Sequence, residues 1–175
     1  PRPQQQQQQG QQQQQQQQGG GGTVIEVGII YTPKAEGHLG DAAKAQAKAG
    51  SLLAGWNTAL KDSNTGVSGK QAGKAFKISK DFDTTQMSAC LTWMRTDKES
   101  TDWRDANKAD LMTCIMEGKA GGGSVGLGAL LTDIKGNKGT FYNCMWHNYG
   151  DTTFAHELGH NMGLGHDKTQ GLSGI

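Results

Sequence analysis

The chain has 175 residues and a net charge of +1 at pH 7, with Lys and Arg residues that are scattered rather than clustered. This distribution argues against a nucleic-acid-binding protein, and the absence of about 18 consecutive apolar residues argues against a membrane-spanning helix. Residues 1–22 are almost all Gln and Gly, so we expect a disordered low-complexity segment there. The remaining residues, roughly 150, are enough for one domain over residues 23–175.

The first part of that domain is expected to form a strand and a long helix. Val24–Tyr31 is rich in β-branched residues and predicts a strand, which Thr32–Pro33 would end. Small and apolar residues then recur at helical spacing over Leu39–Lys61, with Asp41 as a favourable charge near the N-terminal end. The composition of Asp62–Gly73 is typical of a turn.

Strands and helices continue to alternate in the second part. Ala75–Lys80 predicts a second strand, and Met87–Trp103 predicts a short helix or an irregular crossover. Asp110–Met116 is a nearly continuous apolar run, which is expected for a buried central strand. Val125–Leu131, which is diluted by glycine, and Phe141–Trp146 predict two further strands.

A last helix is expected from Thr152 or Thr153, either of which could cap it, to Met162. Elements in this order predict an α/β fold, in which a twisted mixed sheet is covered by a long backing helix and by this last helix. The last helix also carries the most informative pattern of the sequence, H-E-x-x-H-x-x-G-x-x-H-D over residues 156–167.

Three histidines and one glutamate of this pattern are placed for a single metal ion. His156 and His160 lie four residues apart, which puts both rings on one face of a helix. Gly163 can take up a positive φ, end the helix and bring His166 back to the same ion. A His-rich helix that is merely packed in a core is a poor alternative, because each unpaired polar group would cost about 1–3 kcal/mol.

Three neutral imidazole ligands predict one catalytic Zn²⁺ ion, because they leave a coordination position open. We expect Glu157 to be the catalytic residue, since its carboxylate projects from the same turn and is free to face a metal-bound water. As a general base it would take the proton of the attacking water and pass it to the leaving amine of a peptide bond. His38 and His147 are expected to be surface or loop residues.

The motif resembles that of the metzincin zinc metallopeptidases, and Asp167 after the third histidine is similar to the adamalysin or reprolysin branch. Three longer runs look like those of microbial reprolysin-like and peptidyl-Asp metalloendopeptidases: Ile25–Pro33, Ala109–Met112 and Phe154–Gly163. This resemblance implies the N-terminal subdomain of the metzincin fold and a secreted enzyme.

The resemblance also implies how a substrate binds. An extended polypeptide would pair with the edge strand Val125–Leu131, where Gly126 and Gly128 would let its backbone come close. Neither nucleic acid nor a membrane is an expected partner, and we expect a monomer.

The sequence departs from the family pattern in two places. The methionine-containing turn that comes after the zinc motif has no counterpart in residues 171–175, so the C-terminal subdomain is expected to be missing. Cys144 is similar to a family cysteine before the zinc helix, but Val125 or a neighbour stands where its usual partner falls. Cys114 is expected in the core, and the pairing of Cys90 stays open.

Two main hypotheses remain from the sequence. The first is a zinc endopeptidase represented by the N-terminal part of its catalytic domain. The second is a truncated, non-catalytic zinc-binding module that keeps the fold. Glu157 favours the first, because a module that only binds metal needs no base there. A zinc hydrolase with a non-peptide substrate is a remote third interpretation.

Overall fold

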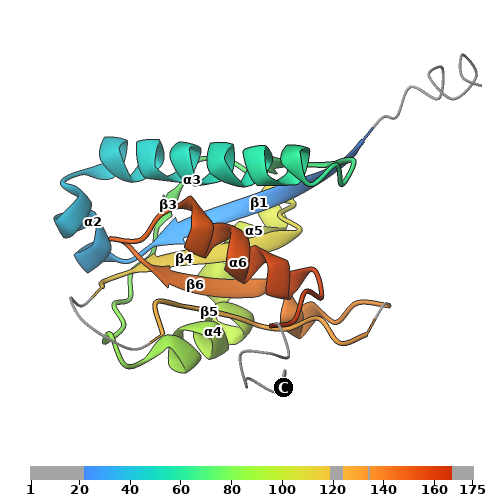
Figure 1. Ribbon diagram of the computed structural model, residues 1–175. Coiled ribbons are helices and arrows are strands. Elements are labelled where there is room, and N and C mark those ends of the chain that lie inside the picture. The colour runs from blue at the N-terminus through green and yellow to red at the C-terminus, as the bar shows by residue number, and fades with distance from the viewer. Residues whose placement is uncertain (1–21, 119–123, 134, 167–175) are drawn as a thin grey trace, which may run out of the picture.

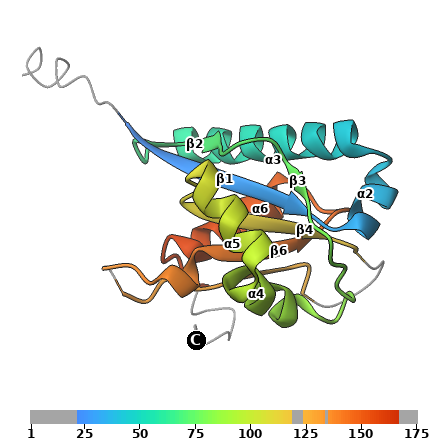
Figure 2. The same cartoon turned by 180° about the vertical axis from the view of Figure 1, so that it is seen from behind.

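The computed structural model describes residues 22–118, 124–133 and 135–166, and it shows one sheet with helices on both faces (Figures 1 and 2). The expectation of disorder falls on residues that lie almost entirely outside these ranges. In chain order the elements are β1 (Thr23–Tyr31), α2 (Pro33–Leu39), α3 (Ala42–Asp62), β2 (Val67–Gln71), β3 (Phe76–Lys77), α4 (Met87–Thr96), α5 (Lys98–Asn107), β4 (Leu111–Met116), β5 (Gly126–Gly128), the 3₁₀ helix η1 (Lys138–Thr140), β6 (Tyr142–Trp146) and α6 (Asp151–Asn161).

The sheet is mixed. Over the described residues its strands run in the order β2-β1-β4-β6-β5, and β3 pairs with the end of β1. The pairs that β1 and β4 make are all parallel, whereas β5 runs antiparallel to β6. Helices α3 and α6 cover one face (Figure 1), and α4 and α5 cover the other (Figure 2). The predicted α/β fold is therefore confirmed.

The hydrophobic core has two layers because successive side chains of a strand point to opposite faces. Val27 and Ile29 of β1 pack in the layer under α3 and α6. Ile30 packs in the layer under α4, together with Met112 and Met116 of β4. All six residues of β4 are buried, as the apolar run predicted.

The helix expected over Leu39–Lys61 is in fact the end of α2 followed by α3. Gly40 separates them with φ of 115°, and Asp41 then caps α3 through its carboxylate, as its position suggested. The sequence interpretation missed α2 because Thr32 and Pro33 have two roles. They end β1, and they also provide the N-cap hydroxyl and the first residue of α2. The helices of the described residues are too short or too polar to cross a membrane.

The turn predicted over Asp62–Gly73 was partly wrong, because this segment contains the edge strand β2. Its middle residue, Gly69, is bridged by the side-chain amide of Asn57 from α3. The Asn57 Nδ2 donates to the Gly69 carbonyl at 2.9 Å, and the Gly69 N–H donates to the Asn57 Oδ1 at 2.7 Å. Contacts with α3 and with β1 thus stabilise a strand that its own composition does not predict.

Two further segments differ from the expectation in length. The strand expected over Ala75–Lys80 pairs only at β3, because Ser79 turns away and donates from its N–H and hydroxyl to the Glu99 carboxylate. The segment Met87–Trp103 forms α4 and the first part of α5, and Asp97 caps α5 by accepting from the Glu99 N–H at 2.9 Å.

Two elements close to the motif also differ from the expectation. β5 is shorter than the predicted Val125–Leu131, because the Leu131 N–H donates to the His160 carbonyl instead of to a strand. The helix α6 begins at Asp151 after Gly150 and has no side-chain cap, so Thr152 and Thr153 are not its caps.

The three cysteines, Cys90, Cys114 and Cys144, are free and buried in the core layer under α4. Cys114 and Cys144 are neighbours in the register of β4 and β6. The expectation that Cys114 is a core residue is confirmed.

The histidines outside the motif lie at the end of the sheet that carries α2. The rings of His38 and His147 stack with their centroids 4.5 Å apart, and the Gly118 N–H donates to the His147 Nδ1 at 2.9 Å. His147 is half-buried, and this burial lowers its pKa from the usual 6.5, with further lowering by His38 and Lys48 and an opposing effect of Glu117.

This shift predicts a pH-dependent stability. Because the folded-state pKa of His147 lies below 6.5, the unfolded chain binds more protons in the interval between the two pKa values. The contribution of neutral His147 to the free energy of unfolding is fully present above pH 6.5. It is lost as the pH falls towards the folded-state pKa. Urea unfolding at several pH values should therefore show a smaller loss below pH 6.5 in His147→Asn, which keeps an acceptor for Gly118 but does not titrate. Equal pH dependence in both proteins would contradict the assignment.

Candidate metal centre

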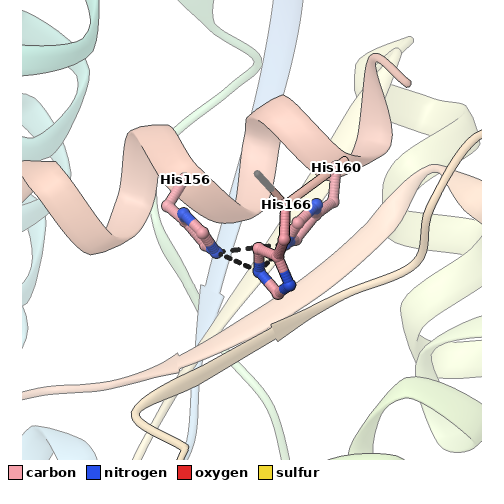
Figure 3. Close-up of side chains that lie close together, drawn as sticks. All are labelled: His156, His160 and His166. Carbon is pink, nitrogen blue, oxygen red and sulfur yellow. Dashed lines mark hydrogen bonds between the residues drawn. The ribbon is translucent and has the colours of Figure 1, made fainter. Parts of the chain in front are cut away.

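The helix α6 places two of the three motif histidines. It buries Phe154 and Leu158 against the sheet, so the opposite side of the helix is turned away from the core. His156 and His160 project together from that side, with ring centroids 4.5 Å apart (Figure 3).

The third histidine returns to the site because the helix ends sharply. Gly163 has φ of 94°, a conformation that favours glycine, and its N–H donates to the His160 carbonyl. The Leu164 N–H donates to the Gly159 carbonyl at 2.9 Å. This turn brings His166 back beside the helix, as the motif predicted from the position of its glycine (Figure 3).

The three imidazoles converge on one point. The Nε2 atoms of His156, His160 and His166 form a triangle with sides of 3.0, 3.0 and 3.1 Å (Figure 3). Three imidazole nitrogens at these mutual distances would be able to bind one zinc ion together, since zinc in proteins commonly has histidine ligands. The donor set therefore fits a zinc ion.

A main-chain carbonyl fixes the orientation of one ring. The Nδ1 of His160 lies 2.7 Å from the Leu164 carbonyl oxygen. Since a carbonyl only accepts, Nδ1 carries the proton, and the lone pair of Nε2 is left to face the site. Leu164 was not among the predicted site residues, because a main-chain contact leaves no mark in the residue type.

Glu157 lies beside the histidines and is only 5% exposed. Its burial raises the pKa of the carboxyl group to about 7, while the backbone N–H of Gly128 opposes the shift. Glu157 also lines the same cavity as the three histidines. The structure thus brings together the four residues that the motif singled out.

The glycines of β5 make close packing of Glu157 possible. A Cβ atom on Gly126 would overlap with the Glu157 carboxylate, and one on Gly128 would lie 2.7 Å from the Glu157 carbonyl oxygen and 3.1 Å from the His160 Cβ. These glycines were predicted to admit a substrate backbone. In the structure the two glycines are needed for a different reason, because a side chain at either position would prevent β5 from packing closely against α6.

A cavity of about 380 Å³ opens over the histidines. Its wall is formed by β5 and the adjoining Val125 and Leu130, so it is largely apolar. The Val125 carbonyl accepts from the Trp146 N–H of β6, and the Ala129 N–H donates to the Tyr142 carbonyl of β6. Because successive main-chain groups of a strand alternate in direction, those of Gly126 and Gly128 point away from β6. Over the described residues no strand pairs with this edge of β5.

A second feature that the sequence interpretation missed is a buried amide pair. Asn161 comes directly after His160 and lies on the same helix face as Phe154 and Leu158, yet it is polar and only 1% exposed. It accepts from the Nδ2 of Asn143 at 2.7 Å. The sequence signal that could have identified Asn161 was an amide on the apolar face of an otherwise amphipathic helix.

Asp167 and residues 171–175 lie outside the described residues.

Two solved structures share the fold. A chain of a chaperone–substrate complex matches with a TM-score of 0.70 at 17% identity, over 83% of this chain and 24% of that one. Metalloproteinase-II from Bacteroides fragilis matches with a TM-score of 0.54 at 14% identity, over 87% of this chain and 46% of that one. The present chain thus spans less than half the length of either structure.

The sequence comparisons place the chain in a family. Curated protein sequences gave no match. Residues 31–174 match a reprolysin model that is described as Metallo-peptidase family M12, which confirms the reprolysin-like resemblance of the motif. The chain therefore belongs to metallopeptidase family M12.

Proposed function

We propose that this chain is a zinc-dependent endopeptidase domain that hydrolyses peptide bonds in protein substrates. Its membership of a metallopeptidase family supports the reaction class. The observation that carries the proposal is the triangle of three Nε2 atoms 3.0–3.1 Å apart next to the buried carboxyl group of Glu157.

In this proposal His156, His160 and His166 hold one zinc ion through Nε2. A zinc ion with three protein ligands and an open position supplies an activated water and polarises the carbonyl of the scissile bond. The Leu164 carbonyl keeps the His160 ring in the tautomer that can bind the ion.

Glu157 is the general base. Its carboxylate accepts a proton from the attacking water and delivers it to the nitrogen of the leaving amine, so no covalent intermediate with the protein is needed. An extended polypeptide pairs with the free edge of β5, whose outward main-chain groups at Gly126 and Gly128 border the cavity. Secretion and a monomeric state complete the proposal. Secretion rests only on the family resemblance.

Metal content and activity test the proposal together. We expect purified protein to hold about one zinc ion per chain and to cleave a denatured protein in a chelator-sensitive way. His160→Ala removes one of three ligands, so zinc content should fall below about a tenth of an ion per chain and cleavage should be lost. Elemental analysis and a gel-based cleavage assay measure both. His147→Asn is a matched control, since His147 stacks on His38 outside the cluster.

The alternative, a zinc-binding module without turnover, makes a different prediction in the same experiment. Such a module would hold stoichiometric zinc and cleave nothing. Protein that folds but binds no zinc would overturn both interpretations.

A further inference from the structure

The buried amide of Asn161 connects the helix that carries the histidines to the strand that borders the cavity. Its Nδ2 lies within hydrogen-bond distance of three main-chain carbonyls, those of Ala129 at 3.0 Å, Thr140 at 2.9 Å and Tyr142 at 3.0 Å. Its Oδ1 accepts from Asn143 at 2.7 Å. Every polar atom of this side chain is therefore in use.

These partners lie at the end of β5 and on the neighbouring segment Thr140–Tyr142 that leads into β6. Ala129 is the residue directly after β5, and its own N–H donates to the Tyr142 carbonyl of β6. Two residues later, the Leu131 N–H donates to the His160 carbonyl at 2.9 Å. The end of β5 is thus joined to the helical turn of His160 twice, once by the main chain and once by Asn161.

Asn143 completes the connection from within the sheet. It is fully buried and lies opposite Gly128 in the register of β5 and β6. Gly128 approaches α6 so closely that a Cβ atom on it would lie 2.7 Å from the Glu157 carbonyl oxygen. Because of this close approach, a change in the spacing of β5 and α6 would also change the packing of Glu157.

We propose that Asn161, held by Asn143, is a positioning residue that fixes β5 at its distance from the three histidines and Glu157. The proposal rests on the peptidase function proposed above for its kinetic consequences. An amide suits this role because its two N–H groups and its carbonyl have defined directions, whereas an apolar side chain of equal size would allow β5 to slide or lift.

Asn161→Leu is the decisive variant, because leucine has nearly the same shape and preserves the apolar packing of the helix face. We expect zinc content to stay at about one ion per chain, while kcat/KM falls on the order of 100-fold, the effect of a misplacement of about 1 Å. Hydrogen exchange of the Ala129 and Leu131 N–H groups should accelerate in the zinc-loaded variant. The Leu131 N–H donates to the His160 carbonyl of α6, and the Ala129 N–H shares its acceptor, the Tyr142 carbonyl, with Asn161.

A matched control separates positioning from general stabilisation. Asn57 makes a comparable side-chain bridge to Gly69, at the opposite edge of the sheet. Asn57→Leu should lower the midpoint of urea unfolding but leave kcat/KM and the exchange of Ala129 and Leu131 unchanged. If Asn161→Leu retained kcat/KM within about twofold, or lost no more than Asn57→Leu, the positioning role would be wrong.

The double variant Asn143→Leu/Asn161→Leu gives a second test. Asn161→Leu leaves the buried Nδ2 of Asn143 without its acceptor, and the second substitution removes that donor, so the double variant should unfold at a higher urea concentration than Asn161→Leu alone. Its kcat/KM should nevertheless stay low, because the link to Ala129 is still absent. Recovery of activity together with stability would overturn the proposal, and this test remains valid if Asn161→Leu alone does not fold.

The exchange measurement also distinguishes the two proposals. If the wild-type protein holds zinc but cleaves no peptide, the peptidase function fails, while faster exchange at Ala129 and Leu131 in Asn161→Leu still supports the positioning role. If the wild-type protein cleaves peptides and neither exchange nor kcat/KM changes in the variant, only the positioning role fails.

Discussion

Replacing Glu157 by glutamine is expected to abolish turnover and to leave zinc binding intact. Glutamine has almost the same shape, so the packing against Gly126 and Gly128 is preserved, and the three imidazoles are untouched. It cannot accept a proton at neutral pH, and general-base catalysis contributes about 10²–10⁴-fold to such reactions. We therefore expect kcat to fall by about that factor at unchanged metal content, measured by a peptide-cleavage assay and elemental analysis.

The control for this variant is another glutamate far from the cavity. Glu26 lies on β1 and pairs with Lys70 at 3.0 Å on the surface, so Glu26→Gln should leave kcat unchanged. Full activity in Glu157→Gln would show that another group takes the proton. Loss of zinc in this variant would show instead that Glu157 supports the metal ligands.

The second large effect is expected for alanine in place of the β5 glycines. At Gly126 the added Cβ meets the Glu157 side chain from Cγ to the carboxylate, so this side chain must move. Gly126→Ala should therefore displace the carboxylate, lower kcat/KM on the order of 100-fold and leave zinc content unchanged. At Gly128 the added Cβ meets the Glu157 carbonyl oxygen at 2.7 Å, so α6 itself must shift. Gly128→Ala should lower the unfolding midpoint and the zinc affinity as well.

Gly50 offers a matched control, because it lies in α3 and a Cβ there meets no atom within 4 Å. Gly50→Ala should leave activity unchanged and raise the free energy of unfolding by about 1 kcal/mol, since alanine is the better helix former. Steady-state kinetics, zinc analysis and urea unfolding on all three variants give the comparison. Equal losses in Gly126→Ala and Gly128→Ala would contradict the distinction between a movable side chain and a fixed backbone.

The arrangement of the histidines could be predicted because it depends on short-range geometry. The four-residue spacing of His156 and His160 fixes one helix face, and a glycine three residues after His160 allows the turn that returns His166. The roles of Leu164 and Asn161 could not be predicted in the same way. One acts through its carbonyl, and the other acts through partners 18 to 32 residues away.

The fold shows the same division between local and distant causes. The apolar run of β4 predicts a buried strand by itself, whereas β2 depends on pairing with β1 and on the amide of Asn57. Thr32 shows a further difficulty, because one residue can end a strand and cap the next helix. A residue pattern that marks the end of one element therefore does not identify the element after it.

The Asn57 bridge has a consequence for self-association. A sheet whose two edge strands are both open to pairing could associate with further copies of itself and polymerise without limit. Here the outward peptide groups of Gly69 are already occupied by Asn57, while those of β5 face the cavity. A second copy is therefore hindered from pairing at Gly69, whereas no strand of the described residues covers the outward groups of β5.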